Sequence, residues 1–62
     1  MKVRRVSPGH ITTDTGYYAK AKVYSNVSGY SHWTVYAPDG EALETYPEVE
    51  QAIEHIRSDT DN

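Results

Sequence analysis

Tyrosine and lysine side chains recur at alternate positions between Gly16 and Ser25, and they are the groups best suited to recognising a partner. The even positions are Tyr18, Lys20, Lys22 and Tyr24, whereas the odd positions are apolar. This period-two alternation predicts a half-buried strand whose even residues share one face. Tyrosine offers a large rigid contact with a polar tip, and lysine beside it also suits base stacking and phosphate neutralisation.

A second alternating stretch follows at residues 30–36, after turn-forming residues at 26–29. Trp33 and Val35 occupy one face, and polar or aromatic side chains occupy the other, so a hairpin with the first strand is the simplest connection. We expect the two strands to display one partner-binding face. Its residues are Tyr18, Lys20, Lys22, Tyr24, His32, Thr34 and Tyr36. The alternative is that tyrosines and lysine stems merely cover the sheet, since strands favour aromatic residues.

Catalytic and metal-binding chemistry is not expected from this sequence. The chain has no cysteine, and His10, His32 and His55 include no closely spaced pair of the kind that zinc sites usually contain. His32 and Asp14 would suit an acid/base pair, but no nucleophile motif or phosphate-binding loop accompanies them. We therefore expect a non-enzymatic protein with no metal and no cofactor.

The second half of the chain predicts a turn, a short strand and a helix. Ala37-Pro38-Asp39-Gly40 has the chemistry of a tight turn, and residues 41–45 read as a strand with Leu43 in the core. Residues 47–58 predict a helix, with a capping box formed by Thr45 and Glu48. Its apolar stripe consists of Val49, Ala52, Ile53 and Ile56.

The two ends of the chain give weaker patterns. Residues 1–15 predict either a further strand or a loop, and residues 59–62 a frayed polar tail. Because the helix stripe must be buried, we expect it to cover the odd face of strands within residues 16–46. The predicted fold is a single α+β domain of two layers, in which a three- or four-stranded antiparallel meander packs against one C-terminal helix.

Charge divides the chain into two unequal parts. Residues 1–36 carry five basic residues and one acidic residue, whereas residues 37–62 carry one basic and eight acidic residues, for a net charge of −3. Such a split predicts surfaces of opposite potential. Glu50 and Glu54 lie four residues apart on the expected outer side of the helix and form a second candidate surface for a basic partner, unless they simply solvate the helix.

Length and hydropathy narrow the functional classes. A chain of 62 residues buries only about 60% of its unfolded surface, so a deep catalytic cleft is not expected. The basic opening segment is not followed by an apolar stretch, and nothing reaches the roughly 20 apolar residues of a membrane span. We expect a cytoplasmic protein with no membrane association.

Residues Trp33 to Ile56 resemble two known families. Trp33-x-Val35, the Asp39-Gly40 turn, a short strand and then Tyr46-Pro47-Glu48-Val49-Glu50-Gln51-Ala52 resemble the three-strand-plus-helix DNA-binding domains at the N-termini of tyrosine recombinases. This resemblance implies DNA contact through the sheet. The same segment is similar to YegP-like bacterial repeats, which imply no settled function.

The residues favour a small protein-binding regulator or inhibitor, of the kind that mobile elements encode, acting on another protein through the Tyr/Lys face. A nucleic-acid-binding module using that face is the first alternative. A homodimer that buries the face is the second.

Overall fold

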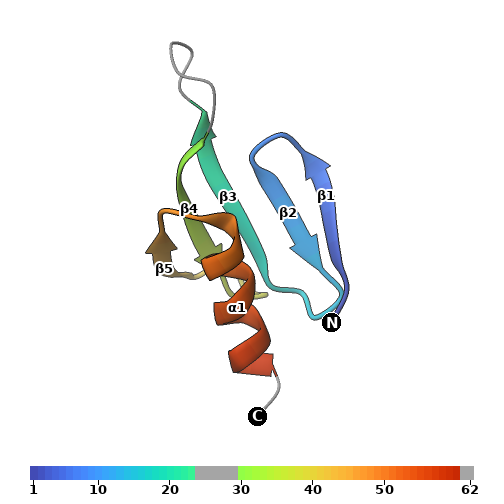
Figure 1. Ribbon diagram of the computed structural model, residues 1–62. Helices are drawn as coiled ribbons and strands as arrows, with labels where there is room; N and C mark the ends of the chain where they lie inside the picture. The colour runs from blue at the N-terminus through green and yellow to red at the C-terminus, as the bar shows by residue number, and fades with distance from the viewer. Residues whose placement is uncertain (24–29, 61–62) are drawn as a thin grey trace.

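The chain folds as a meander of antiparallel strands followed by one helix. The structure, a computed structural model, describes residues 1–23 and 30–60. Its elements are strands β1 (Val3–Ser7), β2 (His10–Thr13), β3 (Tyr18–Val23), β4 (Tyr30–Tyr36) and β5 (Ala42–Tyr46), then helix α1 (Val49–Thr60). The strands lie in chain order in a five-stranded sheet, and each neighbouring pair is antiparallel (Figure 1). The predicted α+β class is confirmed.

The strand count is higher than predicted because residues 1–15 supply a hairpin of their own. β1 and β2 pair through Val3 with Thr13 and Arg5 with Ile11, and the ladder slips between Arg5 and Ser7 before the Pro8-Gly9 turn. β2 then pairs with β3, so the hairpin extends the sheet on the side away from β5. The expectation of three or four strands was therefore too low.

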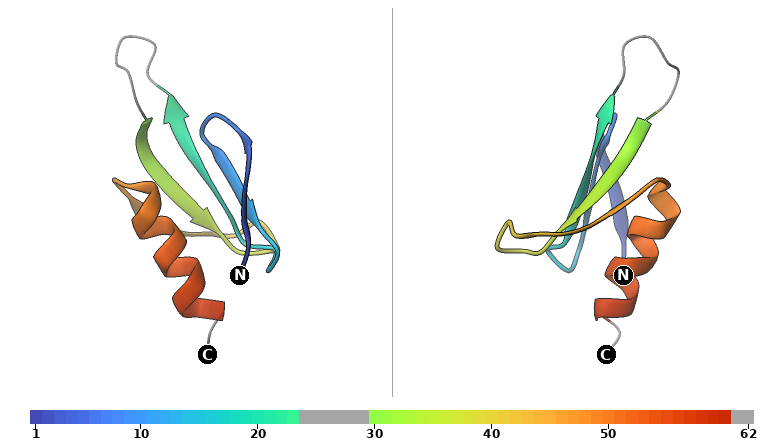
Figure 2. Two further views of the ribbon diagram at one scale, coloured as in Figure 1. Left: turned by 45° about the vertical axis from the view of Figure 1, so that its right-hand side comes forward. Right: turned by 90° about the vertical axis from the view of Figure 1, so that its left-hand side faces the viewer.

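The core lies between α1 and one face of the sheet. Ala19, Trp33 and Val35 alternate inward from β3 and β4, and they meet Ala52 and Ile56 of α1. The helix runs across β4 and β5 on that face (Figure 2). The helix can pack close to the sheet because Ala19, which lies opposite Val35, projects only a methyl group. The predicted helix stripe is confirmed, since Ala52 and Ile56 are buried and Val49 and Ile53 are partly buried against the core.

Two glycines shape one corner of the sheet. Gly40 has φ +93° in the turn between β4 and β5, where its N–H donates to the carbonyl of Ala37 and the Asp39 carboxylate accepts from the N–H of Glu41. Gly16 has φ +94° and faces Pro38 so closely that an added Cβ would lie 3.1 Å from the Pro38 Cβ. The predicted turn at 37–40 is confirmed, and its proline also packs against the loop before β3.

The predicted position of Leu43 in the core is wrong. β5 pairs Glu44 with Val35 and Ala42 with Tyr36, so the ladder is irregular at Leu43. Leu43 is the extra residue at this irregularity, and it is 37% exposed. Residues two apart share a face, which places Leu43 with Thr45 on the side away from the helix.

The predicted capping box is also wrong. Thr45 belongs to β5, and its hydroxyl lies 3.3 Å from that of Thr34 across the sheet. Instead, the Glu48 N–H donates to the Gln51 side chain at 3.2 Å, and the Glu48 carbonyl accepts from the N–H of Ala52. The helix starts two residues later than predicted, and it continues through Asp59 and Thr60, which were expected to fray.

Candidate functional site: the open face of the sheet

The face of the sheet opposite α1 carries two cross-strand rows of polar and aromatic side chains, which we call the open face. Strand pairing aligns directly opposed residues on the same side of a sheet. The first row is Arg4, Thr12, Tyr18, Tyr36 and Ala42, in order from β1 to β5. The second row is His10, Lys20, Thr34 and Thr45, in order from β2 to β5.

An aromatic stack occupies the middle of the first row. The rings of Tyr18 and Tyr36 lie 4.9 Å apart between centroids with an interplanar angle of 11°. His10 meets Tyr18 edge-on at 6.1 Å, and the Lys20 ammonium lies 5.7 Å from the centre of the Tyr18 ring. Each tyrosine is half-buried, although no helix covers it. The stack therefore forms a preset aromatic platform with a cation beside it.

Other predicted members of the face lie around this platform. His32 and Lys20 are exposed, and Thr34 is partly buried beside Thr45. Lys22 belongs to β3, but its side chain lies outside the described part of the structure, as does the whole of Tyr24. The structure thus brings Tyr18, Lys20, Thr34 and Tyr36 together, and strand alternation puts His32 on the same side.

The sequence prediction missed the contribution of the N-terminal hairpin to this face. Arg4, His10 and Thr12 join it through the pairing of β1 with β2 and of β2 with β3. The sequence contains a short signal, because apolar Ile11 stands between the polar residues His10 and Thr12, and the structure buries Ile11 while its neighbours stay partly exposed. Four residues are too few for such alternation to identify a strand on its own.

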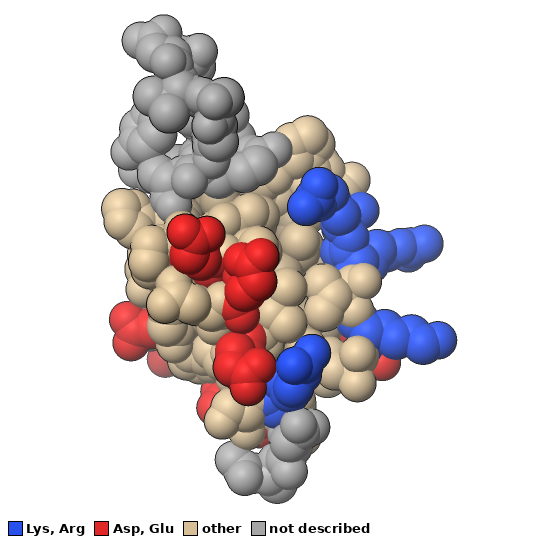
Figure 3. Space-filling view, in the orientation of Figure 1, with Lys and Arg blue, Asp and Glu red and all other residues tan. Residues whose placement is uncertain are grey.

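The second predicted surface lies on α1. Glu50 and Glu54 are both exposed, and Glu54 forms an ion pair with Arg57 at 3.4 Å. Acidic side chains gather over α1, whereas basic ones project from the side of the molecule where β1 runs (Figure 3). On the face that Figure 3 shows, acidic residues thus lie mostly over α1 and basic residues mostly along β1.

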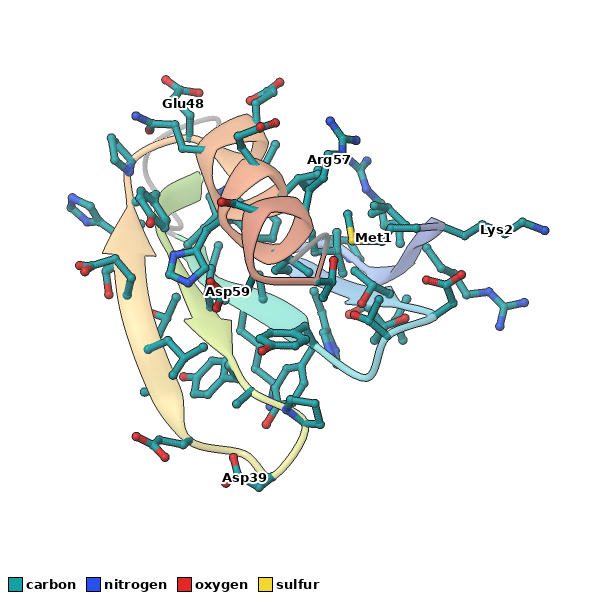
Figure 4. The ribbon with its side chains drawn as sticks, turned by 90° about the horizontal axis from the view of Figure 1, so that it is seen from below. Met1, Lys2, Asp39, Glu48, Arg57 and Asp59 are labelled. Atoms are coloured by element: carbon teal, nitrogen blue, oxygen red, sulfur yellow. The ribbon has the colours of Figure 1, made fainter. Side chains whose placement is uncertain are left out.

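A network of three side chains, Tyr46, His55 and Asp59, links α1 to β5. The Tyr46 hydroxyl lies 2.6 Å from His55 Nδ1, and His55 Nε2 lies 3.3 Å from the Asp59 carboxylate. His55 thus links Tyr46 of β5 to Asp59 of α1 through its two ring nitrogens. Asp59 sits on the last turn of the helix (Figure 4). No sequence pattern predicts these contacts, because Tyr46 and His55 meet only through the packing of helix on sheet.

The described residues contain no group of three or more His, Asp or Glu side chains placed to hold a metal ion. Within residues 1–23 and 30–60, no helix has the length and apolar character needed to cross a bilayer. No protein-family model, curated protein or solved structure matches the chain.

Proposed function

We propose that the chain is a small, non-enzymatic protein-binding module that regulates or inhibits its partner through the open face. The observation that carries this proposal is the stacked pair of Tyr18 and Tyr36 on a sheet face that α1 does not cover. Aromatic residues of this kind are enriched at the centres of protein interfaces.

The arrangement of the platform favours binding in two ways. Each tyrosine is already held by the other ring, so little side-chain freedom is left to lose when a partner docks. Thr34, Thr45 and Thr12 supply hydroxyl groups around the rings, on the rows defined by strand pairing. A partner with an apolar patch ringed by hydrogen-bonding groups would match this surface.

Nucleic-acid binding by the same face is the second candidate function. Lys20 lies beside the Tyr18 ring, and Arg4 stands in the same row as Tyr18, so phosphate and base would each find a suitable group. The resemblance of residues 33–56 to recombinase DNA-binding domains supports this candidate. The net charge of −3 favours the protein partner instead, because phosphate contacts dominate nucleic-acid affinity.

A third candidate is a homodimer in which two open faces meet. The Tyr18 and Tyr36 platform is self-complementary in chemistry, since stacked rings accept further aromatic contact. In that case the tyrosines stabilise the dimer, and the acidic surface at Glu50 and Glu54 becomes the place to look for a partner.

The experiment compares capture by the immobilised wild-type chain with capture by Tyr18→Ala and Tyr36→Ala variants. Each lysate is used with and without nuclease, captured proteins are identified by mass spectrometry, and the affinity of a purified partner is then measured. We expect either substitution to weaken binding by about tenfold or more, as for an anchor residue in an interface. Glu44→Ala, an exposed change on the helix side of β5, is the matched control and should bind normally.

The outcomes separate the three candidates. Binding that survives nuclease and changes little with salt supports a protein partner. Binding that disappears with nuclease, and that Lys20→Ala weakens with a reduced salt slope, would assign the face to nucleic acid. A dimer of the wild-type chain and a monomer of the Tyr36→Ala variant in analytical ultracentrifugation would assign the open face to self-association.

A further inference from the structure

β1 forms one edge of the sheet and is exposed along its whole length. Among the described residues it pairs only with β2, and all of its side chains are exposed. Met1, Val3 and Val6, three of the four exposed large apolar residues of the described chain, lie on or beside it. An edge strand of this kind leaves a row of backbone N–H and C=O groups without partners in the sheet.

The hydrogen bonds at the start of β1 show which backbone groups face outward. The Asp14 N–H donates to the Lys2 carbonyl at 3.1 Å, and the Asp14 carboxylate accepts from the Lys2 N–H at 3.1 Å. Antiparallel strands alternate between residues that bond inward and residues that bond outward. The N–H and C=O groups of Val3 and Arg5 therefore point away from β2, toward the free edge.

The charged side chains of the edge strand are all basic, and the Asp14 carboxylate lies beside them at the Lys2 N–H. Lys2, Arg4 and Arg5 all belong to the edge, and Lys2 projects outward from it (Figure 4). Alternation puts Val3 and Arg5 on the helix side and Arg4 on the open face, so each side of the edge combines a cation with nearby apolar surface. A hollow of about 440 Å³ lies against Lys2, Val3 and Arg4 of the edge and residues 12–14.

The positive charge of the β1 edge determines which kind of strand can pair with it. Two copies of β1 pairing with each other would bring like charges into direct opposition, which is destabilising. A strand that alternates carboxylates with aliphatic or threonine side chains would pair with the cations and cover Val3 and Val6.

We infer that the free edge of β1 binds an acidic, extended segment of a partner protein by strand addition, using the outward backbone groups of Val3 and Arg5. This site runs along the free edge of β1 and shares only Arg4 with the open face. Backbone hydrogen bonds would supply the docking geometry, and Lys2, Arg4 and Arg5 would select for acidic sequences.

The test uses the full chain and a fluorescent, end-capped peptide of sequence Glu-Val-Glu-Thr-Glu-Val-Glu-Thr. Anisotropy measures binding, and amide hydrogen exchange by NMR locates it. We expect the peptide to slow exchange at the amides of Val3 and Arg5, and a peptide with every Glu replaced by Lys to bind at least about tenfold more weakly. If the Glu peptide does not bind, or binds without protecting these amides, the inference is wrong.

Three variants sharpen the assignment. Val3→Pro removes one outward N–H but keeps all edge charges, and proline is tolerated where an edge N–H faces solvent, so binding should fall while the fold persists. Arg4→Glu combined with Arg5→Glu should weaken binding by about tenfold or more. Lys20→Glu changes one charge on the open face and is the control, for which we expect less than about a threefold change.

Two further results would overturn the inference in favour of another occupant. Slow exchange at Val3 and Arg5 in the free chain, together with a concentration-dependent oligomer in sedimentation, would show that a second copy occupies the edge. Tighter binding of a single-stranded oligonucleotide of eight nucleotides than of the peptide, with no effect of Val3→Pro on either, would assign the basic residues to phosphate.

Discussion

The two faces of β3 and β4 differ in how their side chains are shielded from solvent. On the helix side, Ala19 and Val35 are fully buried and Trp33 is 5% exposed, under Ala52 and Ile56. On the open face, Tyr18 and Tyr36 are larger than most of these residues, yet they stay partly exposed and cover one another. On the helix side, the small residue Ala19 leaves space for α1. On the open face, the rings of Tyr18 and Tyr36 stack and shield each other.

We expect the helix side to determine the stability of the fold and the open face to determine recognition. Apolar area removed from water stabilises the fold by roughly 25 cal/mol per Å², and the apolar core of the described residues lies on the helix side of the sheet. Substitutions on that side should therefore unfold the chain, and substitutions on the open face should leave it folded.

Trp33→Ala is expected to lower the free energy of unfolding by about 3–5 kcal/mol, because it leaves a cavity beneath α1. A domain of this size has little more than that in total, so the variant should be largely unfolded. Urea or thermal unfolding followed by circular dichroism measures the loss. His32→Ala is the matched control, since His32 is the adjacent, exposed residue. A cooperative transition shifted by no more than the control would show that Trp33 is not central to the core.

Ala19→Leu should destabilise the chain by about 1–3 kcal/mol, although it adds apolar surface. Ala19 is fully buried, so a larger side chain would push α1 away from the sheet. Lys20→Leu puts the same residue at the next position on the exposed open face, where we expect a change within about 0.5 kcal/mol. Equal unfolding midpoints for the two variants would contradict the contrast between the faces.

Much of this contrast was predictable from the sequence. Alternation in residues 16–25 and 30–36 separated Ala19, Trp33 and Val35 from Tyr18 and Tyr36 correctly, because each strand has one wet and one dry face. The helix stripe was predictable for the same reason. Turn chemistry located the Asp39-Gly40 turn, since a positive φ at Gly40 is a local requirement.

The errors arose where local patterns do not determine tertiary structure. Strict alternation predicts Leu43 in the core, but the irregular ladder opposite Tyr36 puts it on the other face. Thr45 fits a helix cap by spacing, but the sheet extended β5 past it to Tyr46. β1 has no buried residue and therefore no burial pattern to detect. The contributions of Arg4 and His10 to the open face depend on that missed hairpin.

Tyr46→Phe is expected to have the smallest effect of the three substitutions on the free energy of unfolding. Tyr46 pairs with Trp33 on the helix side, and its hydroxyl reaches His55 on α1. Removing the hydroxyl keeps the ring packing but breaks this hydrogen bond, for a loss of about 0.5–1.5 kcal/mol in the free energy of unfolding. Urea unfolding measures that loss, and faster amide exchange in the second half of α1 would localise it. Tyr36→Phe removes the same group from the open face and should change stability by less than about 0.5 kcal/mol. If Tyr36→Phe costs as much as Tyr46→Phe, the hydroxyl of Tyr46 does not fasten the helix, and the ring alone accounts for its position against the core.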